Sequence, residues 1–187
     1  PNCELNQGVL KPWKTLSSDL LVDDQWMTLR ADRCEREDGL IIEPYYVWET
    51  RDFGHAIPVL ADGRIVLVRQ YRHATGMFGL EFPGGVLDEG EAPLTGARRE
   101  LQEECGATGG DWSNIAAFYP NPARQTNRFH CFLGVGVELT ESTAFDPNEE
   151  LELHLLTSAE LDQAITDGTF HQASHIAAYL MAKIRCK

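Results

Sequence analysis

The stretch GGVLDEGEAPLTGARRELQEECGA, residues 84–107, constrains the fold of this 187-residue chain more than any other segment. Pro93 suits the first turn of a helix, and Gly106 suits the position just past a helix end. The pattern therefore predicts a helix over roughly 92–105. Because the apolar residues of this helix recur on one face, we expect it to pack against a sheet.

The polar side of the predicted helix crowds carboxylates. Glu100 and Glu104 lie one turn apart, about 6 Å, at the edge of the apolar face, and Glu103 lies further round. Like charges at this spacing repel each other, and ionised carboxylates at reduced dielectric are costly without a cation. Arg99 can pair with Glu103, which leaves the other two carboxylates for a metal. Hard divalent cations take such oxygen ligands, whereas the alternative is a solvated acidic helix face.

Charge and cysteine usage narrow the class of protein. Sixteen Lys and Arg residues against 29 Asp and Glu residues give a net charge of −13, which disfavours binding to nucleic acid or to anionic membranes. No apolar run approaches the roughly 20 residues that span a bilayer. The five cysteines are scattered, with no CxxC pair, and indicate reduced thiols. We therefore expect a cytoplasmic protein without a nucleic-acid or membrane partner.

Strand and helix patterns give a fold class. Alternating β-branched runs flank Asp62-Gly63 and predict a hairpin over 55–72. Further strands are expected across 16–48, 115–139 and 151–156, and helices near 158–165 and 174–184. Strands mixed with few helices indicate an α+β fold, an α/β/α sandwich around a mixed β-sheet. We divide the chain into an N-terminal β-rich segment, residues 1–53, and a main domain, residues 54–187.

The fixed positions of the 84–107 stretch resemble the signature box of the Nudix hydrolases. Gly85 and Glu91 precede Arg-Glu-Leu-x-Glu-Glu-x-Gly-Ala, residues 99–107, at the spacing of that box. Ala107 is a departure, since a larger aliphatic residue is usual there. The resemblance implies the Nudix-type α/β/α sandwich.

Flanking segments narrow the resemblance. IVLVRQYR, residues 65–72, and LEFPGG, residues 80–85, are similar to segments of ADP-ribose pyrophosphatases and related nucleoside diphosphate sugar hydrolases. After Pro122, however, Ala-Arg-Gln-Thr replaces the glycine and small-polar-acidic run that is usual in those relatives. The resemblance implies Mg-dependent hydrolysis of the pyrophosphate bond of an ADP-ribose-like nucleoside diphosphate sugar, giving two phosphomonoesters. The alternatives are hydrolysis of another nucleoside diphosphate derivative, such as GDP-mannose, and a non-catalytic nucleotide-sensing module.

For the metal site, the resemblance implies Mg²⁺ or Mn²⁺ held by oxygen ligands: the Glu100 and Glu104 carboxylates, Glu103 nearby, and the Gly84 carbonyl. Metal ions neutralise a diphosphate, orient water and lower its pKa. Arg99 belongs to the same catalytic group and is expected to act indirectly, by holding Glu103.

Four residues are candidates for contact with the substrate. Arg72 ends a predicted strand and resembles a phosphate ligand, because a guanidinium suits phosphoryl oxygens. Glu81 is similar to a family glutamate close to the metals. Arg124 and Arg128, in the loop YPNPARQTNRFH, can supply positive charge near an anionic substrate. Their alternative is that of solvated surface charges.

The box does not settle the general base. In related ADP-ribose pyrophosphatases a glutamate on a mobile loop, well past the box, activates the water. The corresponding segment here is FDPNEELELHLL, and Glu149 and Glu150 just before its predicted strand are the candidates, with Glu149 placed first. A solvated acidic turn is the alternative.

The resemblance also implies a homodimer. In relatives of this type, N-terminal strands contribute to the partner's substrate site. The apolar, aromatic-rich segment 16–53 suits such an interface.

Overall fold

The computed structural model describes residues 10–140 and 150–185. The chain divides into two compact units. One contains the residues up to Thr50 together with Asn121–Thr126, and the other contains Arg51–Pro120 and the residues from Asn127 onward. No helix in the described ranges has the length and apolar character needed to cross a membrane.

The smaller unit is a three-stranded antiparallel sheet with the order β1-β2-β3. Its strands are β1 (Lys14–Asp23), β2 (Thr28–Glu35) and β3 (Ile41–Glu49). The Asp24 carboxylate separates β1 from β2, because it accepts hydrogen bonds from the backbone N–H groups of Trp26 and Met27. A side chain that bonds the backbone two or three residues on favours a turn over a continued strand.

The larger unit is built on a seven-stranded mixed sheet with the path β10-β5-β4-β9-β8, to which β6 adds beside β5 and β7 beside β4. The central pair β4 and β9 is parallel, and the other pairs are antiparallel. The strands are β4 (Phe53–Leu60), β5 (Ile65–Arg72), β6 (Met77–Glu81), β7 (Gly84–Val86), β8 (Ala107–Phe118), β9 (Phe129–Leu139) and β10 (Leu151–Leu156).

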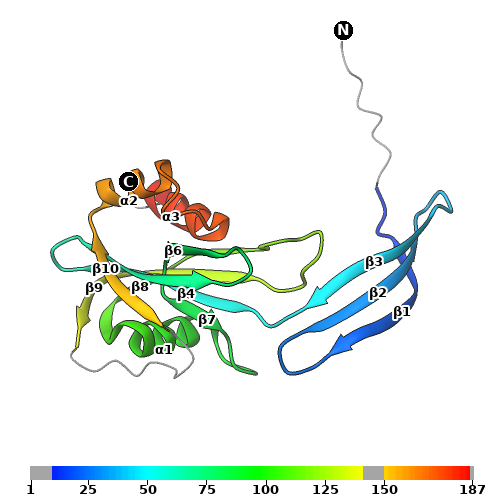
Figure 1. Ribbon diagram of the computed structural model, residues 1–187, viewed down its shortest axis with the longest axis horizontal. Coiled ribbons are helices and arrows are strands. Elements are labelled where there is room, and N and C mark those ends of the chain that lie inside the picture. The colour runs from blue at the N-terminus through cyan, green and yellow to red at the C-terminus, as the bar shows by residue number, and fades with distance from the viewer. Residues whose placement is uncertain (1–9, 141–149, 186–187) are drawn as a thin grey trace, which may run out of the picture. The chain divides into compact units, whose positions relative to one another are not determined.

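Helices cover both faces of this sheet, which confirms the predicted α/β/α sandwich. Helix α1 (Pro93–Cys105) packs on one face, and α2 (Ser158–Thr166) and α3 (Ala173–Arg185) pack on the other (Figure 1). Strand residues alternate between the two layers, as a pleated strand requires. On β4, for example, Ala56 faces the α1 layer and Ile57 faces the α2–α3 layer.

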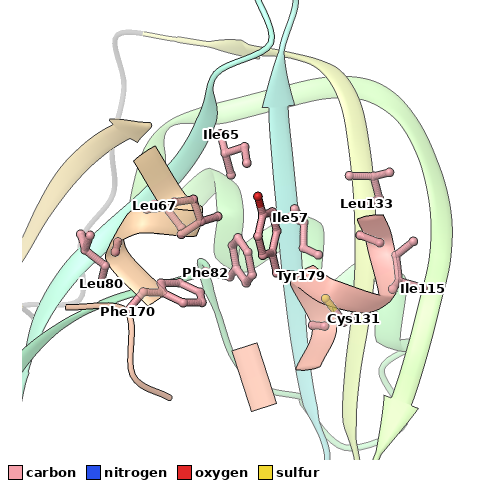
Figure 2. Close-up of a cluster of buried hydrophobic side chains, with 14 of the residues drawn as sticks. Ile57, Ile65, Leu67, Leu80, Phe82, Ile115, Cys131, Leu133, Phe170 and Tyr179 are labelled. Carbon is pink, nitrogen blue, oxygen red and sulfur yellow. The ribbon is translucent and has the colours of Figure 1, made fainter. Parts of the chain in front are cut away.

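The larger core lies between the sheet and the helices α2 and α3. Figure 2 shows Phe82 and Tyr179 in the middle of this cluster, with Phe170 to one side and Ile115 to the other. Phe82 is 1% exposed and Phe170 is fully buried. Phe82 follows β6, so the segment between β6 and β7 is anchored in this core.

Helix α1 begins and ends where the sequence predicts. Pro93 occupies its first turn, and Gly106 takes a left-handed conformation (φ 59°) whose N–H bonds the Gln102 carbonyl. Its buried face lies directly on β4, because Gly54 has no side chain. A Cβ atom there would lie 2.9 Å from the Pro93 carbonyl oxygen. This close approach fixes the distance between the sheet and the carboxylates of α1.

Two histidines are buried beside the larger core. His55 on β4 and His175 on α3 lie with their ring centroids 4.8 Å apart. His55 also stacks on Phe129, with 4.2 Å between the ring centroids. Burial lowers the pKa of His55 from 6.5 to about 4 and lowers that of His175 well below 6.5. Both imidazoles are therefore neutral at pH 7.

These two pKa shifts make stability depend on pH. Below about 6.5 the unfolded histidines bind protons that the folded ones do not, so the free energy of unfolding should fall as pH drops from 6.5 toward 4. Urea denaturation at pH 7, 6 and 5 measures this slope, above the range where most carboxylates titrate. His55→Phe keeps a ring and should reduce the slope. A flat stability between pH 7 and pH 5 would contradict the prediction.

Candidate active site

The larger unit contains a cavity of about 710 Å³ whose walls come from three parts of the fold. Helix α1 contributes Arg99 and the three glutamates of the box, and β4, β5 and β7 contribute the second wall. Gln172 and Ser174, at the start of α3, form the third. Of the sequence-predicted residues, the cavity brings together Arg72, Gly84, Arg99, Glu100, Glu103 and Glu104.

The guanidinium of Arg99 binds three carboxylates at once. Its Nη1 lies 2.9 Å from Glu103 Oε2 and 3.0 Å from Glu100 Oε1, and its Nε lies 3.1 Å from Glu91 Oε1. The expected pair with Glu103 is present, but Glu100 is also engaged, unlike the expectation from the helix spacing. The hydrogen bond to Glu91 and the nearby Glu100 raise the pKa of Arg99, and Arg99 in turn lowers the pKa of Glu91.

Glu104 binds the backbone of β7. The residue is 7% exposed, and its Oε2 accepts a hydrogen bond of 2.9 Å from the Gly84 N–H. Next to it, a Cβ atom on Gly85 would lie only 2.6 Å from Glu100 Oε1. The two glycines of β7 thus let the backbone meet two carboxylates of α1 directly.

The donor set suits a hard divalent cation. Three carboxylates and a backbone segment with carbonyl oxygens line one cavity, and Mg²⁺ and Mn²⁺ prefer oxygen ligands. Among the described residues, no group of three or more His, Cys, Asp or Glu side chains is already arranged to hold a metal. The oxygen ligands of this cavity are therefore of the type that such a cation binds. A cation bound here would compete with Arg99 for Glu100 and Glu103.

Arg72 and Glu81 form a bidentate pair. Arg72 Nε lies 3.0 Å from Glu81 Oε1, and Nη2 lies 2.7 Å from Oε2. Glu81 is 4% exposed, whereas Arg72 lines the cavity. A parallel two-bond contact fixes the plane of a guanidinium, so Glu81 orients Arg72 at the cavity wall.

Neither of the two loop arginines is among the described residues that line this cavity. Arg124 belongs to the smaller unit, where its Nη1 donates to the Tyr46 carbonyl and its guanidinium covers the Tyr45 ring. Arg128 belongs to the larger unit and donates from Nη2 to the Tyr119 hydroxyl at 3.0 Å. Arg128 is not among the described residues that line the cavity.

The candidate general bases are only partly described. Glu149 lies outside the described residues, and Glu150 is an exposed residue directly before β10. Leu151 pairs with Gln70 of β5, and Gln70 lines the cavity. The chain therefore enters β10 beside one wall of the site.

Sequence reasoning missed several cavity residues. Gln70 lies two positions before Arg72 on β5, so the alternation of that strand was a signal for it. His55, Gln172 and Ser174 come from distant segments that only the folded sheet and α3 bring together. No local pattern marks them.

Known families and proteins are similar to this chain in sequence. Residues 51–179 match the NUDIX domain, and residues 13–48 match the nucleoside diphosphate sugar hydrolase N-terminal domain. An ADP-ribose pyrophosphatase of Bacillus subtilis is 36% identical over 136 residues, which cover 71% of this chain and 72% of that protein. A CMP-5'-(N-acetyl-N-hydroxy-3-aminopropyl)phosphonate hydrolase of Streptomyces rubellomurinus is 28% identical over 166 residues, 84% and 78% of the two chains.

A solved structure has the same fold. The crystal structure of an ADP compounds hydrolase superposes with a TM-score of 0.84 at 21% identity and covers 94% of this chain and 95% of its own. This likeness shows that the two chains share the sandwich fold. The match over residues 51–179 identifies the family: the chain belongs to the Nudix hydrolases.

Arg99 and its neighbour Arg98 provide a matched test of the carboxylate network. Arg99→Ala leaves three glutamates close together without their shared cation, so we expect a loss of about 1–3 kcal/mol in the free energy of unfolding. Arg98 is exposed, and Arg98→Ala should change stability by less than about 0.5 kcal/mol. Chemical denaturation measures both, and equal effects of the two substitutions would contradict the network's role.

Proposed function

We propose that this enzyme hydrolyses the pyrophosphate bond of an ADP-ribose-like nucleoside diphosphate sugar and releases two phosphomonoesters. The observation that carries the proposal is the cavity in which Glu100, Glu103 and Glu104 face a wall that bears Arg72. The sequence of the chain supports the proposed substrate class. The 36% identical relative is an ADP-ribose pyrophosphatase, and the N-terminal segment matches a nucleoside diphosphate sugar hydrolase domain.

The proposal includes Mg²⁺ or Mn²⁺ bound by Glu100, Glu104 and the Gly84 carbonyl, with Glu103 nearby. Such a cation neutralises the diphosphate and makes water a better nucleophile. The charge of the chain makes a cation necessary, because a net charge of −13 and a carboxylate-lined wall would otherwise repel an anionic substrate.

The chain's own residues bind and orient the diphosphate. Arg72 presents a guanidinium whose plane is fixed by Glu81, and this geometry suits the oxygens of a phosphoryl group. Arg99 keeps Glu100 and Glu103 at the cavity wall before a cation binds. Arg124 and Arg128 remain proposed substrate contacts. Their present bonds to Tyr46 and Tyr119 would have to be exchanged for bonds to the substrate.

A second substrate class has specific support. The Streptomyces relative is named as a hydrolase of a CMP-linked phosphonate, so a base other than adenine occurs among similar proteins. The Ala-Arg-Gln-Thr run after Pro122 differs from the run that is usual in ADP-ribose pyrophosphatases. This difference also favours a substrate other than ADP-ribose. Hydrolysis of another nucleoside diphosphate derivative, such as GDP-mannose, is therefore the alternative, and a nucleotide-sensing module without turnover is the weaker one.

One experiment separates these functions. Purified protein with Mg²⁺ should cleave ADP-ribose faster than GDP-mannose or CMP-linked substrates, with AMP among the products. Glu104→Gln should lower kcat by at least about 100-fold, since even groups outside a metal's ligand shell contribute about 10–100-fold. Glu138→Gln, an exposed glutamate on β9, is the control. Binding of ADP-ribose without any turnover would instead indicate a sensing module.

We also propose a loop glutamate as the general base, with Glu149 before Glu150. Glu149→Gln should lower kcat by roughly 100-fold or more, within the usual contribution of a general base, with little change in KM. Glu150→Gln tests the second candidate, one residue away, and should cause the smaller loss. Steady-state kinetics of both variants measure the difference, and small, equal losses would place the base elsewhere.

We propose further that the protein is a homodimer that works in the reducing cytoplasm. The smaller unit exposes large apolar side chains, among them Leu20 (58% exposed) and Trp26 (81%). Cys34, Cys105 and Cys131 are buried free thiols, consistent with a reducing compartment. Light scattering should give a dimer mass. Leu20→Asp should shift it toward the monomer, whereas Leu180→Asp, at an exposed leucine of α3, should not. A monomeric, fully active wild-type protein would refute the dimer.

A further inference from the structure

The short segment Glu81–Gly85 connects β6 to β7 and delivers Gly84 and Gly85 to the carboxylates of α1. We name residues 81–85 the strap. What fixes the strap determines where the Gly84 carbonyl and the Glu104 carboxylate lie. The inference below rests on the proposed function, because it assigns a role toward the proposed cation site.

Two buried histidines hold the middle of the strap. The Phe82 N–H donates to His175 Nδ1 at 2.9 Å, and the Phe82 carbonyl accepts from His55 Nδ1 at 3.4 Å. One imidazole comes from α3 and the other from β4. A single residue of the strap is therefore held on both its polar backbone groups by side chains from two distant elements.

The rest of the strap is held by groups of the sheet and of α1. The Pro83 carbonyl accepts from the Ala56 N–H at 2.9 Å, and the Gly84 N–H donates to Glu104 at 2.9 Å. Pro83 has no N–H to satisfy. The hydrogen bonds thus run in an unbroken series along the strap, from the imidazole on α3 to the carboxylate on α1.

His175 has the features of a fixed acceptor. It is fully buried, and its ring stacks on that of Phe82 at 5.7 Å with an interplanar angle of 10°. Phe129 and Phe170 contact it from other directions. Because Nδ1 accepts a hydrogen bond, the proton of the neutral ring resides on Nε2. Nε2 has no partner among the described residues, so the one polar contact made by this ring is with the strap.

We propose that His175 is a positioning residue for the cation site. The hydrogen bond to its Nδ1 fixes the position of the Phe82 peptide. The hydrogen bond from the Gly84 N–H of the strap in turn fixes the position of the Glu104 carboxylate. Gln172 directly precedes the same helix, Ser174 lies in its first turn, and both line the cavity. Helix α3 therefore belongs to the active site through a hydrogen bond as well as through its surface.

Two substitutions separate this role from simple packing. His175→Asn loses volume but keeps an acceptor, because its side-chain oxygen takes the place of Nδ1. His175→Leu keeps more of the volume but leaves the Phe82 N–H without a partner. If packing decides, Leu is the better replacement, and if the acceptor decides, Asn is the better one.

The readout is Mn²⁺ affinity without substrate, measured by electron paramagnetic resonance. His175→Leu should weaken Mn²⁺ binding by about 10-fold, the lower end of the usual effect of groups that orient metal ligands. His175→Asn should stay within about threefold of wild type and retain kcat. Tyr179→Phe, one turn further along α3, loses hydrogen bonds to Ser158 and Asp162 and is the control for general destabilisation. It should lower the melting temperature without changing Mn²⁺ affinity.

A measurement on the wild-type protein tests the hydrogen bond itself. Nuclear magnetic resonance should detect a scalar coupling between the Phe82 amide nitrogen and His175 Nδ1, together with a protonated Nε2. This result does not depend on the folding of any variant. Absence of the coupling overturns the proposal, as does a Leu variant that binds Mn²⁺ as well as the Asn variant does.

The outcomes distinguish this inference from the proposed function. If the wild-type protein neither binds Mn²⁺ nor hydrolyses ADP-ribose, the proposed function fails, while the coupling still reports on the strap. If the wild-type protein does both and His175→Leu behaves like the wild type, the positioning role of His175 fails alone.

Discussion

The contact between Gly54 of β4 and the first turns of α1 is the constraint on which the rest of the site depends. Because no side chain separates them, the helix lies close enough to the sheet for Glu104 to reach the Gly84 N–H. A Cβ atom on Gly85 would displace the Glu100 carboxylate from its present position. The glycines before the helix and the glutamates within it thus form a single steric arrangement. In it, the backbone of β7 faces the carboxylates of α1.

Arg99 resolves the electrostatic problem that this arrangement creates. Three carboxylates at the edge of a core repel one another, and one guanidinium bound to all three offsets that repulsion. The network stabilises the fold and holds Glu100 and Glu103 at the cavity wall. A divalent cation bound in the same cavity would take over part of this charge compensation, because it would compete with Arg99 for Glu100 and Glu103.

The sequence predicted the elements whose signals are local. Pro93 and Gly106 define α1, and the spacing of Arg99 and Glu103 predicted their pair, both as found. The hydrogen bonds between Arg99 and Glu91 depend on a loop that folds back along the helix. No periodic pattern in the sequence predicts that loop conformation. The cavity wall formed by the start of α3 depends on packing across the whole sheet. Long-range arrangements of this kind leave no pattern in neighbouring residues, because the chain brings them together only after the sheet has formed.

The parallel pairing of β4 with β9 has a consequence for the order in which the molecule assembles. A parallel pair needs a long crossover, and here the chain between the two strands includes the hairpin, the strap, α1 and β8. Contacts between residues so distant in sequence slow folding. The entropy of closing the long loop is lost before strand pairing stabilises the chain. His175 arrives later still, on α3, after every carboxylate of the box has been synthesised. A growing chain therefore carries all the acidic groups of the site well before His175 can accept the hydrogen bond of the Phe82 N–H in the strap.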